Sequence, residues 1–291
     1  MNLPEFEYFE PRDVNEACAL LAEDPDGSAV LAGGTDVLVN LKGGLISYRR
    51  LVSLRRIAGL ARIDFSREQG LVIGAMATVN EVARHADVAR EFPGIVDAAI
   101  SLAAEQVRNL ATVAGNICSA VPSADMAPIL LALGARVRLC SRDGERVVPL
   151  AEFFTGPRTT VIAPGEVLVA IEVPAKGAGT GDASVRQGGR EALSLPLAGA
   201  AAAVTLDGDI SVRAAVALGA VAPTPIMGAG VGEFLAGKRL TPEVLREAAE
   251  LASAAARPID DLRASKAYRL ELVAVLTARA VARAAERATR G

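Results

Sequence analysis

Two segments rich in glycine and other small residues most constrain what this chain can fold into. The first, residues 31–38, reads Leu-Ala-Gly-Gly-Thr-Asp-Val-Leu and ends a short apolar run. Adjacent glycines take positive φ angles without a steric penalty, so successive amides can point into one concavity and bind an anion beside the start of a helix. The Thr35 hydroxyl adds a further donor. For this segment alone, an ordinary tight turn before a capped helix is the alternative.

The second segment runs from Gln106 to Asp125 and combines small residues with hydrogen-bonding groups. These groups are at Thr112, Gly115, Asn116, Ser119 and Ser123. Asp125 supplies a carboxylate of the kind that accepts hydrogen bonds from ribose hydroxyls in dinucleotide-binding folds. The alternative is a buried polar loop whose hydroxyls satisfy its own backbone.

Together the two segments predict a site for a dinucleotide. Its pyrophosphate carries two anionic groups, and two glycine-lined loops can close over it from both sides. Neither segment has the G-x-G-x-x-G spacing of a Rossmann site, and the chain has no G-x-x-x-x-G-K-[ST] motif of a nucleoside triphosphatase. We therefore expect the loops to face each other across one pyrophosphate in a fold of another type.

Length and composition favour a globular protein of more than one domain. The 291 residues exceed the usual size of a single domain, and 51% are apolar while 22% are charged, which is enough for a hydrophobic core. The formal charge of -3, without a dense Lys/Arg block, disfavours nucleic acid as the main partner. Cys18, Cys118 and Cys140 form no C-x-x-C pair. The chain alone therefore does not supply the four ligands of a structural zinc site or an iron–sulfur cluster.

We expect a cytoplasmic protein without a membrane span. The odd number of cysteines fits a reducing compartment, and the first residues lack the basic and apolar regions of a signal peptide. The longest uncharged stretch, Ala214–Gly232, contains Pro223 and Pro225, which indicates a buried strand followed by a loop. His85, the only histidine, lies in a polar run, where we expect a solvated surface residue and no catalysis.

The apolar periodicity predicts a mixed α+β chain. In its first part we expect helices at 14–22, 37–41, 80–89, 94–104 and 127–134, strands at 29–32, 51–54, 71–73, 136–139, 146–148 and 167–173, and a loop at 107–122. A glycine-rich shift at 176–189 marks the expected domain boundary. Beyond it, Asp207-Gly208 indicates a hairpin between strands 200–206 and 210–217. Helices are expected after Thr241-Pro242, by its cap pattern, and at 261–287.

Several of these segments resemble the FAD-binding signatures of one family, the flavoprotein (medium) subunits of molybdenum hydroxylases such as carbon monoxide dehydrogenase and bacterial xanthine dehydrogenase. The similar segments are Ala32–Asp36, Gln106–Asn109, Thr112–Asn116, Pro122–Asp125, Ile73–Ala75 with Thr78, Phe153–Gly156 and Ala163–Leu168. They occur in the family's order and cover nearly the whole chain, which makes the resemblance more specific than any single loop.

The resemblance implies an α+β fold: a vanillyl-alcohol-oxidase-type (PCMH-like) FAD-binding domain over 1–176, with two subdomains split near 55–60, and a smaller C-terminal domain of antiparallel sheet and helices over 177–291. By likeness, the amides of Ala32–Asp36 and Thr112–Asn116 bind the pyrophosphate, Asp125 binds the adenosine ribose side, and Ile73–Thr78 passes close to the flavin. The implied FAD-binding residues are Ala32, Gly33, Gly34, Thr35, Asp36, Val37, Gly74, Thr78, Thr112, Ala114, Gly115, Asn116, Ser119, Ser123, Asp125, Val167, Leu168 and Arg186.

The chain departs from the family pattern at three places. Ala114 stands where the family usually has a first glycine, and Ser119 where it often has asparagine. The segment Ala183–Arg190 has no aromatic residue, so the group that stacks on the flavin is not identified. Arg186 and Arg190 can place positive charge near the flavin or lie on a solvated surface. The sequence indicates no catalytic residue.

The implied function is electron transfer: FAD would pass electrons from a partner's iron–sulfur clusters to NAD, oxygen or a quinone. The implied partners are a small [2Fe-2S] subunit and a large molybdopterin subunit in a hetero-oligomer, and the substrate would be chosen by the large subunit. One alternative is a stand-alone FAD oxidoreductase of the same fold, which one histidine and three tyrosines make a poorer fit. The other is a scaffold module that has lost its flavin.

Overall fold

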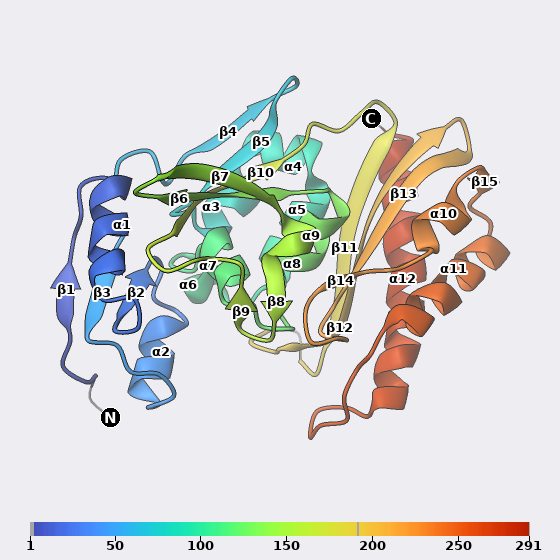
Figure 1. Cartoon of the computed structure of the whole chain (residues 1–291). Coiled ribbons are helices and arrows are strands. Elements are labelled where there is room, and N and C mark those ends of the chain that lie inside the picture. The colour runs from blue at the N-terminus through green and yellow to red at the C-terminus, as the bar shows by residue number, and fades with distance from the viewer. Residues whose placement is uncertain (1–2, 191, 291) are drawn as a thin grey trace.

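The computed structural model describes residues 3–190 and 192–290, and Figure 1 shows its sheets arranged side by side from the N-terminus to the C-terminus. The first sheet is parallel and has the strand order β1 (Glu7–Phe9), β3 (Arg50–Ser53), β2 (Ser28–Leu31). The connections contain α1 (Val14–Glu23) and α2 (Val37–Lys42). Asp13 caps α1, because its side chain accepts from the Glu16 amide at 2.8 Å. The expected strand–loop–helix at 29–41 is confirmed.

The second sheet is antiparallel and lies in the middle of Figure 1. Its order is β4 (Ile63–Ser66), β5 (Gly70–Gly74), β10 (Val167–Val173), β6 (Arg136–Ser141), β7 (Gly144–Pro149). A hairpin at Asp143-Gly144 joins β6 and β7, with Gly144 at φ +133°. After β7 come α9 (Leu150–Phe153) and a small pair, β8 (Phe154–Gly156) and β9 (Thr159–Thr160).

A group of short helices connects β5 to β6. These are α3 (Val79–Arg84), α4 (Ala86–Glu91), α5 (Pro93–Ser101), α6 (Glu105–Arg108), α7 (Val113–Cys118) and α8 (Ala127–Ala132). The single helix expected at 80–89 is wrong, because the chain turns extended at His85 (φ -69°, ψ 124°). On one continuous helix Val82 and Val88 would lie about 120° apart around the axis; the break lets both be fully buried.

Two further predictions in this region need correction. The helix expected at 94–104 ends at Ser101, because Leu102 is extended and Ala103 adopts a left-handed φ of +44°. The loop expected at 107–122 contains the end of α6 and all of α7. Helix α7 begins there because the Thr112 side chain accepts from the Gly115 amide and caps the helix.

The third sheet is formed by β11 (Thr180–Gly188), β12 (Pro196–Asp207), β13 (Ile210–Gly219) and β14 (Ile226–Met227), and β15 (Lys238–Arg239) also pairs with β13. The hairpin at Asp207-Gly208 is confirmed, with Gly208 at φ +58°. Helices α10 (Val231–Leu235), α11 (Pro242–Ala255) and α12 (Lys266–Ala288) complete this part. Helix α12 begins later than the expected 261, because Ser265 is its cap.

The glycine-rich segment at 176–189 is largely strand β11, although its composition indicates a boundary. Gly181 in β11 lies directly against α12. A methyl group at this position would overlap the Ala284 carbonyl oxygen on α12. The missing side chain therefore lets helix and sheet approach closely.

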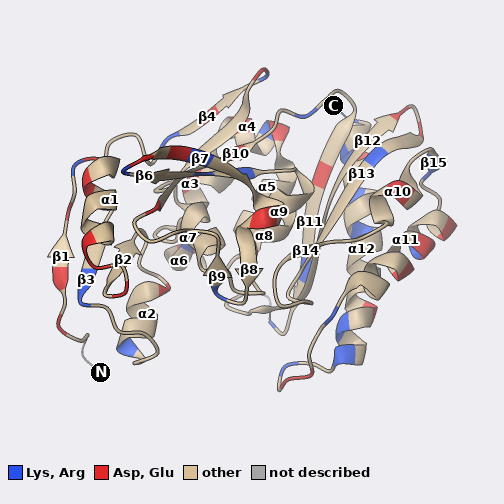
Figure 2. Cartoon of the chain, in the orientation of Figure 1, with Lys and Arg blue, Asp and Glu red and all other residues tan. Residues whose placement is uncertain are grey.

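The third sheet is covered on both faces. Ala200, Ala202 and Val216 point into a core with α11 and α12, whereas Ala201 and Ala217 belong to the core of the first two sheets and their helices. Helices α5 and α8 pack against this second face. Figure 2 shows acidic residues on α1 and charged residues of both signs on α11 and α12. No helix among residues 3–190 and 192–290 is long and apolar enough to cross a bilayer.

Candidate functional site

The first small-residue loop connects β2 to α2 and presents a run of backbone amides. Gly34 has a left-handed φ of +75°, which glycine adopts without strain. Among the described residues, the amides of 33–37 donate to no backbone or side-chain acceptor, and regular bonding begins with the Leu38 amide to Gly34 O at 3.2 Å. Because unpaired amides need an acceptor, this loop offers donors to an anion.

The second loop is built by its own side chains. Thr112, only 2% exposed, accepts from the Gly115 amide at 2.9 Å. Asn116 Oδ1 accepts from the Met126 amide at 3.2 Å, and the Ser119 hydroxyl donates to Asn116 O at 2.8 Å. These side-chain groups therefore shape the loop, and the donors left for a ligand are backbone groups such as the Ala114 amide, which has no acceptor among the described residues.

Replacing Thr112 with valine tests this assignment. Valine fits the same space but removes the oxygen that caps α7, so the Gly115 amide loses its partner. We expect the free energy of unfolding to fall by about 1–2 kcal/mol and the affinity for FAD to weaken, because the loop loses its shape. Urea unfolding and FAD titration measure both quantities. Thr112→Ser keeps the oxygen and should change neither by much; equal losses in both variants would contradict the capping role.

The structure brings the two loops together. A methyl group at Gly33 would overlap the carbonyl oxygen of Leu110 and lie 2.7 Å from its carbonyl carbon, so the two backbones are in direct contact. A third expected segment joins them: the Val79 amide donates to Ala111 O at 2.8 Å, and the Val113 amide donates to Ala77 O at 3.2 Å. Segments 32–37, 74–78 and 110–116 thus lie together in one cluster.

The remaining expected residues have different positions. The Thr78 hydroxyl donates to Glu81 Oε2 at 2.8 Å in a capping box of α3, so its side chain is used locally. Gly74 packs against the Leu60 carbonyl, where a side chain would overlap. Val167 and Leu168 on β10 are 1% and 4% exposed and belong to the hydrophobic core. Val167 and Leu168 can therefore contact a cofactor only through their main-chain atoms.

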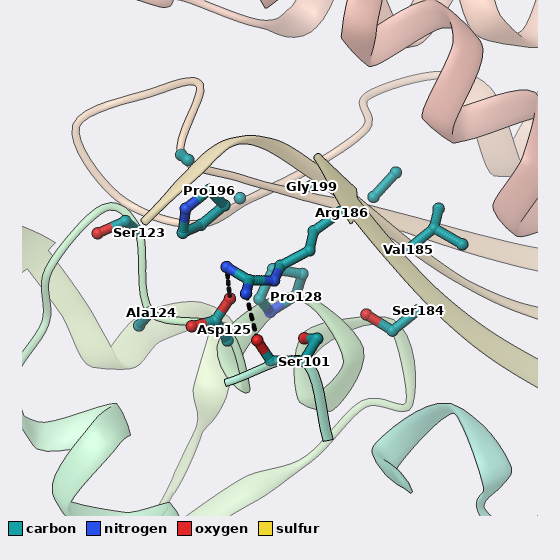
Figure 3. A pocket seen from close by; sticks show the side chains of 13 residues that line it. Ser101, Ser123, Ala124, Asp125, Pro128, Ser184, Val185, Arg186, Pro196 and Gly199 are labelled. Carbon is teal, nitrogen blue, oxygen red and sulfur yellow. Dashed lines mark hydrogen bonds and ion pairs between the residues drawn. The ribbon is translucent and has the colours of Figure 1, made fainter. Parts of the chain in front are cut away.

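Asp125 and Arg186 meet in a small cavity between the α7–α8 loop and the third sheet, as Figure 3 shows. The cavity has about 10 Å³ of free space, room for about one water molecule. Arg186 Nη1 lies 3.2 Å from Asp125 Oδ1, and the two side chains are only 12% and 11% exposed. The contact lacks hydrogen-bond geometry, so Oδ1 is a buried acceptor without a donor in the described structure. Ser123 lines the same cavity.

The Asp125 carboxyl is electrostatically unusual. Burial raises the pKa of Asp125 to about 6, and the Arg186 guanidinium opposes this increase. An ionised carboxylate only accepts hydrogen bonds, so Asp125 is suited to accept from a hydroxyl.

The motif Gln106–Asn109 has a structural use that its sequence does not reveal. Arg108 donates to Asn80 Oδ1 at 3.1 Å and to Leu102 O at 2.8 Å, and Asn80 donates to Asn109 Oδ1 at 2.6 Å. These bonds hold the chain that leads into the second loop. Sequence reasoning also missed the Leu110 carbonyl, because a backbone contact between distant segments leaves no side-chain pattern.

These groups fit FAD. The unpaired amides of 33–37 and Ala114 suit an anionic bridge, and the second segment ends in the Asp125 carboxylate, a group that can accept from a hydroxyl of an attached arm. Bound FAD supplies redox chemistry, while the protein supplies binding and orientation.

The chain matches known proteins along nearly its whole length. Residues 4–176 match the family described as FAD binding domain in molybdopterin dehydrogenase, and residues 183–284 match the CO dehydrogenase flavoprotein C-terminal domain. The carbon monoxide dehydrogenase medium chain of Afipia carboxidovorans is 34% identical over 97% of this chain and 98% of that protein. The xanthine dehydrogenase FAD-binding subunit of Escherichia coli O157:H7 is 32% identical over 95% of each.

Solved structures agree in fold. A chain of reconstituted CO dehydrogenase from Oligotropha carboxidovorans superposes with a TM-score of 0.95 at 32% identity, over 99% of this chain and 100% of that chain. A chain of quinoline 2-oxidoreductase from Pseudomonas putida 86 gives 0.93 at 32% identity, over 99% of each. The expected fold class is therefore confirmed. The chain belongs to the family of FAD-binding flavoprotein subunits of molybdopterin-dependent dehydrogenases such as CO dehydrogenase and xanthine dehydrogenase.

Proposed function

We propose that this chain is the electron-transfer subunit of a molybdenum-containing hydroxylase or dehydrogenase, in which FAD receives electrons from a partner's iron–sulfur clusters and delivers them to NAD, oxygen or a quinone. The observation that carries the proposal is the contact of Gly33 with the Leu110 backbone beside unpaired amides. Redox chemistry of this kind belongs to the cofactor, so the protein needs a precise binding site more than a general acid or base.

In this proposal each segment has one task. The amides of 33–37 and the Ala114 amide bind the pyrophosphate, and the Asp125 carboxylate accepts from a hydroxyl of the adenosine arm. The backbone around Gly74 and Thr78, together with the main chain at Val167 and Leu168, borders the flavin. The domains are residues 1–176, divided near 55–60, and residues 177–291.

The proposed partners are a small [2Fe-2S] subunit and a large molybdopterin subunit, in a cytoplasmic hetero-oligomer. Support comes from the relatives, which include medium chains and a subunit of a 6-hydroxypseudooxynicotine dehydrogenase complex. Purifying the chain from its native host, followed by protein identification and metal analysis, tests this part. Molybdenum and iron in stoichiometric amounts with two companion subunits are expected; a metal-free chain purified alone would contradict it.

Ligand selectivity tests the site itself. If the loops bind a pyrophosphate, FAD at 100 times its Kd should increase the free energy of unfolding by about 2.7 kcal/mol. The unfolding temperature should rise with it. ADP should compete with FAD, because it carries the same diphosphate and ribose. FMN should stabilise the protein much less, because it lacks the pyrophosphate bridge. Equal stabilisation by FMN and FAD, measured in one thermal series, would refute pyrophosphate recognition.

A further inference from the structure

Arg186 lies where three segments of the chain meet. It belongs to β11 of the third sheet, yet its guanidinium reaches across to the first part of the protein (Figure 3). Nη1 donates to Ser194 O at 2.7 Å and lies 3.2 Å from Asp125 Oδ1, while Nη2 donates to Ser101 O. With only 12% of its side chain exposed, Arg186 is committed to these contacts.

Two of the three segments contain strained backbone. Ala103, just after the Ser101 carbonyl, has φ +44°, and Leu193, just before the Ser194 carbonyl, has φ +53°. The two strained residues are joined, because the Leu193 amide donates to Ala103 O at 3.3 Å. Non-glycine residues persist in the left-handed region only when their surroundings hold them there. Arg186 bonds to the carbonyl two residues before Ala103 and to the carbonyl one residue after Leu193. The Leu102 and Leu193 carbonyls accept from Arg108 and Arg190.

The segment after Ser101 leads directly to the FAD loops. Arg108 binds the Leu102 carbonyl at 2.8 Å, and the chain then continues through α6 to Leu110, whose backbone contacts Gly33. The third contact of Arg186, Asp125, is the carboxylate assigned above to a hydroxyl of FAD. One guanidinium from the C-terminal sheet therefore reaches both the backbone that supports the pyrophosphate loops and the carboxylate.

We propose that Arg186 is a positioning residue of the FAD site, which fixes Asp125 and the two strained segments at 101–103 and 193–194 so that FAD affinity depends on it through these groups. This inference rests on the proposed function. It replaces the expectation that Arg186 acts as a free positive charge beside the flavin.

The proposal predicts a shift in pH dependence. Binding needs the Asp125 carboxylate, whose pKa lies at about 6, so FAD affinity should fall as pH decreases through that value. In the described structure the cavity is lined by α5, the α7–α8 loop, α8, β11, β12 and β13, and Asp125 and Arg186 are the only charged residues among the lining residues. The nearby Asp97 is paired with Arg283 and Arg287. Removing the Arg186 charge therefore leaves Asp125 without its cation, and its pKa should rise.

The experiment titrates the full-length chain with FAD, by quenching of flavin fluorescence, from pH 5 to pH 8. Arg186→Met should weaken binding at pH 7 by about tenfold or more and move the midpoint of the affinity–pH curve up by about one pH unit. Arg186→Lys keeps the charge and should keep the midpoint, with weaker binding because it cannot make all three contacts. Arg213→Met, on the exposed side of β13, is the matched control and should behave as the wild type.

A variant series separates positioning from mere stabilisation. Asp125→Asn should abolish the pH dependence, and adding Arg186→Met to it should weaken binding less than in the wild type, because the two residues act together. An unchanged affinity in Arg186→Met, or a loss of equal size at every pH with an unmoved midpoint, would overturn the proposal. If Arg186→Met does not fold, Arg186→Lys decides the question. Weaker FAD binding with the wild-type midpoint of the affinity–pH curve supports the proposal, and unchanged FAD affinity overturns it. A wild-type chain that binds no FAD would instead refute the proposed function.

Discussion

Gly33→Ala is expected to separate the two loops and to abolish tight FAD binding. The added methyl group would overlap the Leu110 carbonyl, and both groups belong to backbone that cannot swing aside. An extra methyl group in a site without room for it reduces the free energy of unfolding by about 1–3 kcal/mol. Since the pyrophosphate needs amides from both loops at once, we expect the affinity for FAD to fall by about 100-fold or more.

The matched control for this prediction is Gly177→Ala. At Gly177 an added methyl group would meet nothing closer than the Thr180 hydroxyl at 3.9 Å, so neither stability nor FAD affinity should change appreciably. Fluorescence titration and urea unfolding of both variants give the comparison. Wild-type affinity in Gly33→Ala would show that loop contact is not required for binding.

Gly34→Val is expected to lose FAD while the fold persists. Gly34 adopts φ +75°, a conformation in which a β-branched residue is a genuine outlier. The nearest atom to an added Cβ is Leu38 Cδ1 at 2.9 Å, the flexible end of a side chain, so packing can adjust. The backbone, however, would leave its left-handed conformation and turn the amides of 34–36 away from the ligand. We expect affinity to drop by about 100-fold or more.

Gly44→Val separates the effect of backbone angle from that of position. Gly44 follows α2, has a similar φ of +68° and faces open space, so it bears the same conformational strain outside the site. Both variants should lose about 1–3 kcal/mol of stability, but only Gly34→Val should lose bound FAD, seen as visible absorbance of the purified protein. A yellow Gly34→Val protein with wild-type flavin content would exclude Gly34 from the site.

Features with local causes could be predicted from the sequence. The Thr241-Pro242 helix start, the Asp207-Gly208 hairpin and the glycine turn before α2 each depend on residues within a few positions. For the same reason both loops of the site could be identified. Their similarity to one family then indicated the fold class, which the comparison with solved structures confirms.

Features with distant causes could not be predicted. The break at His85 accompanies the burial of Val82 and Val88, and β11 pairs with β12 while its Gly181 lies against α12. The pairing of Arg186 with Asp125 joins residues that lie far apart in the chain. Such contacts depend on how whole elements pack, and local propensity carries no information about them.

A crystal structure of the full-length chain with bound FAD tests the proposed binding site most directly. We expect the pyrophosphate to lie between the loops, with its oxygens within hydrogen-bond distance of amides from both 33–37 and 112–116. A pyrophosphate that contacts only one of these segments, or neither, would contradict the proposed site.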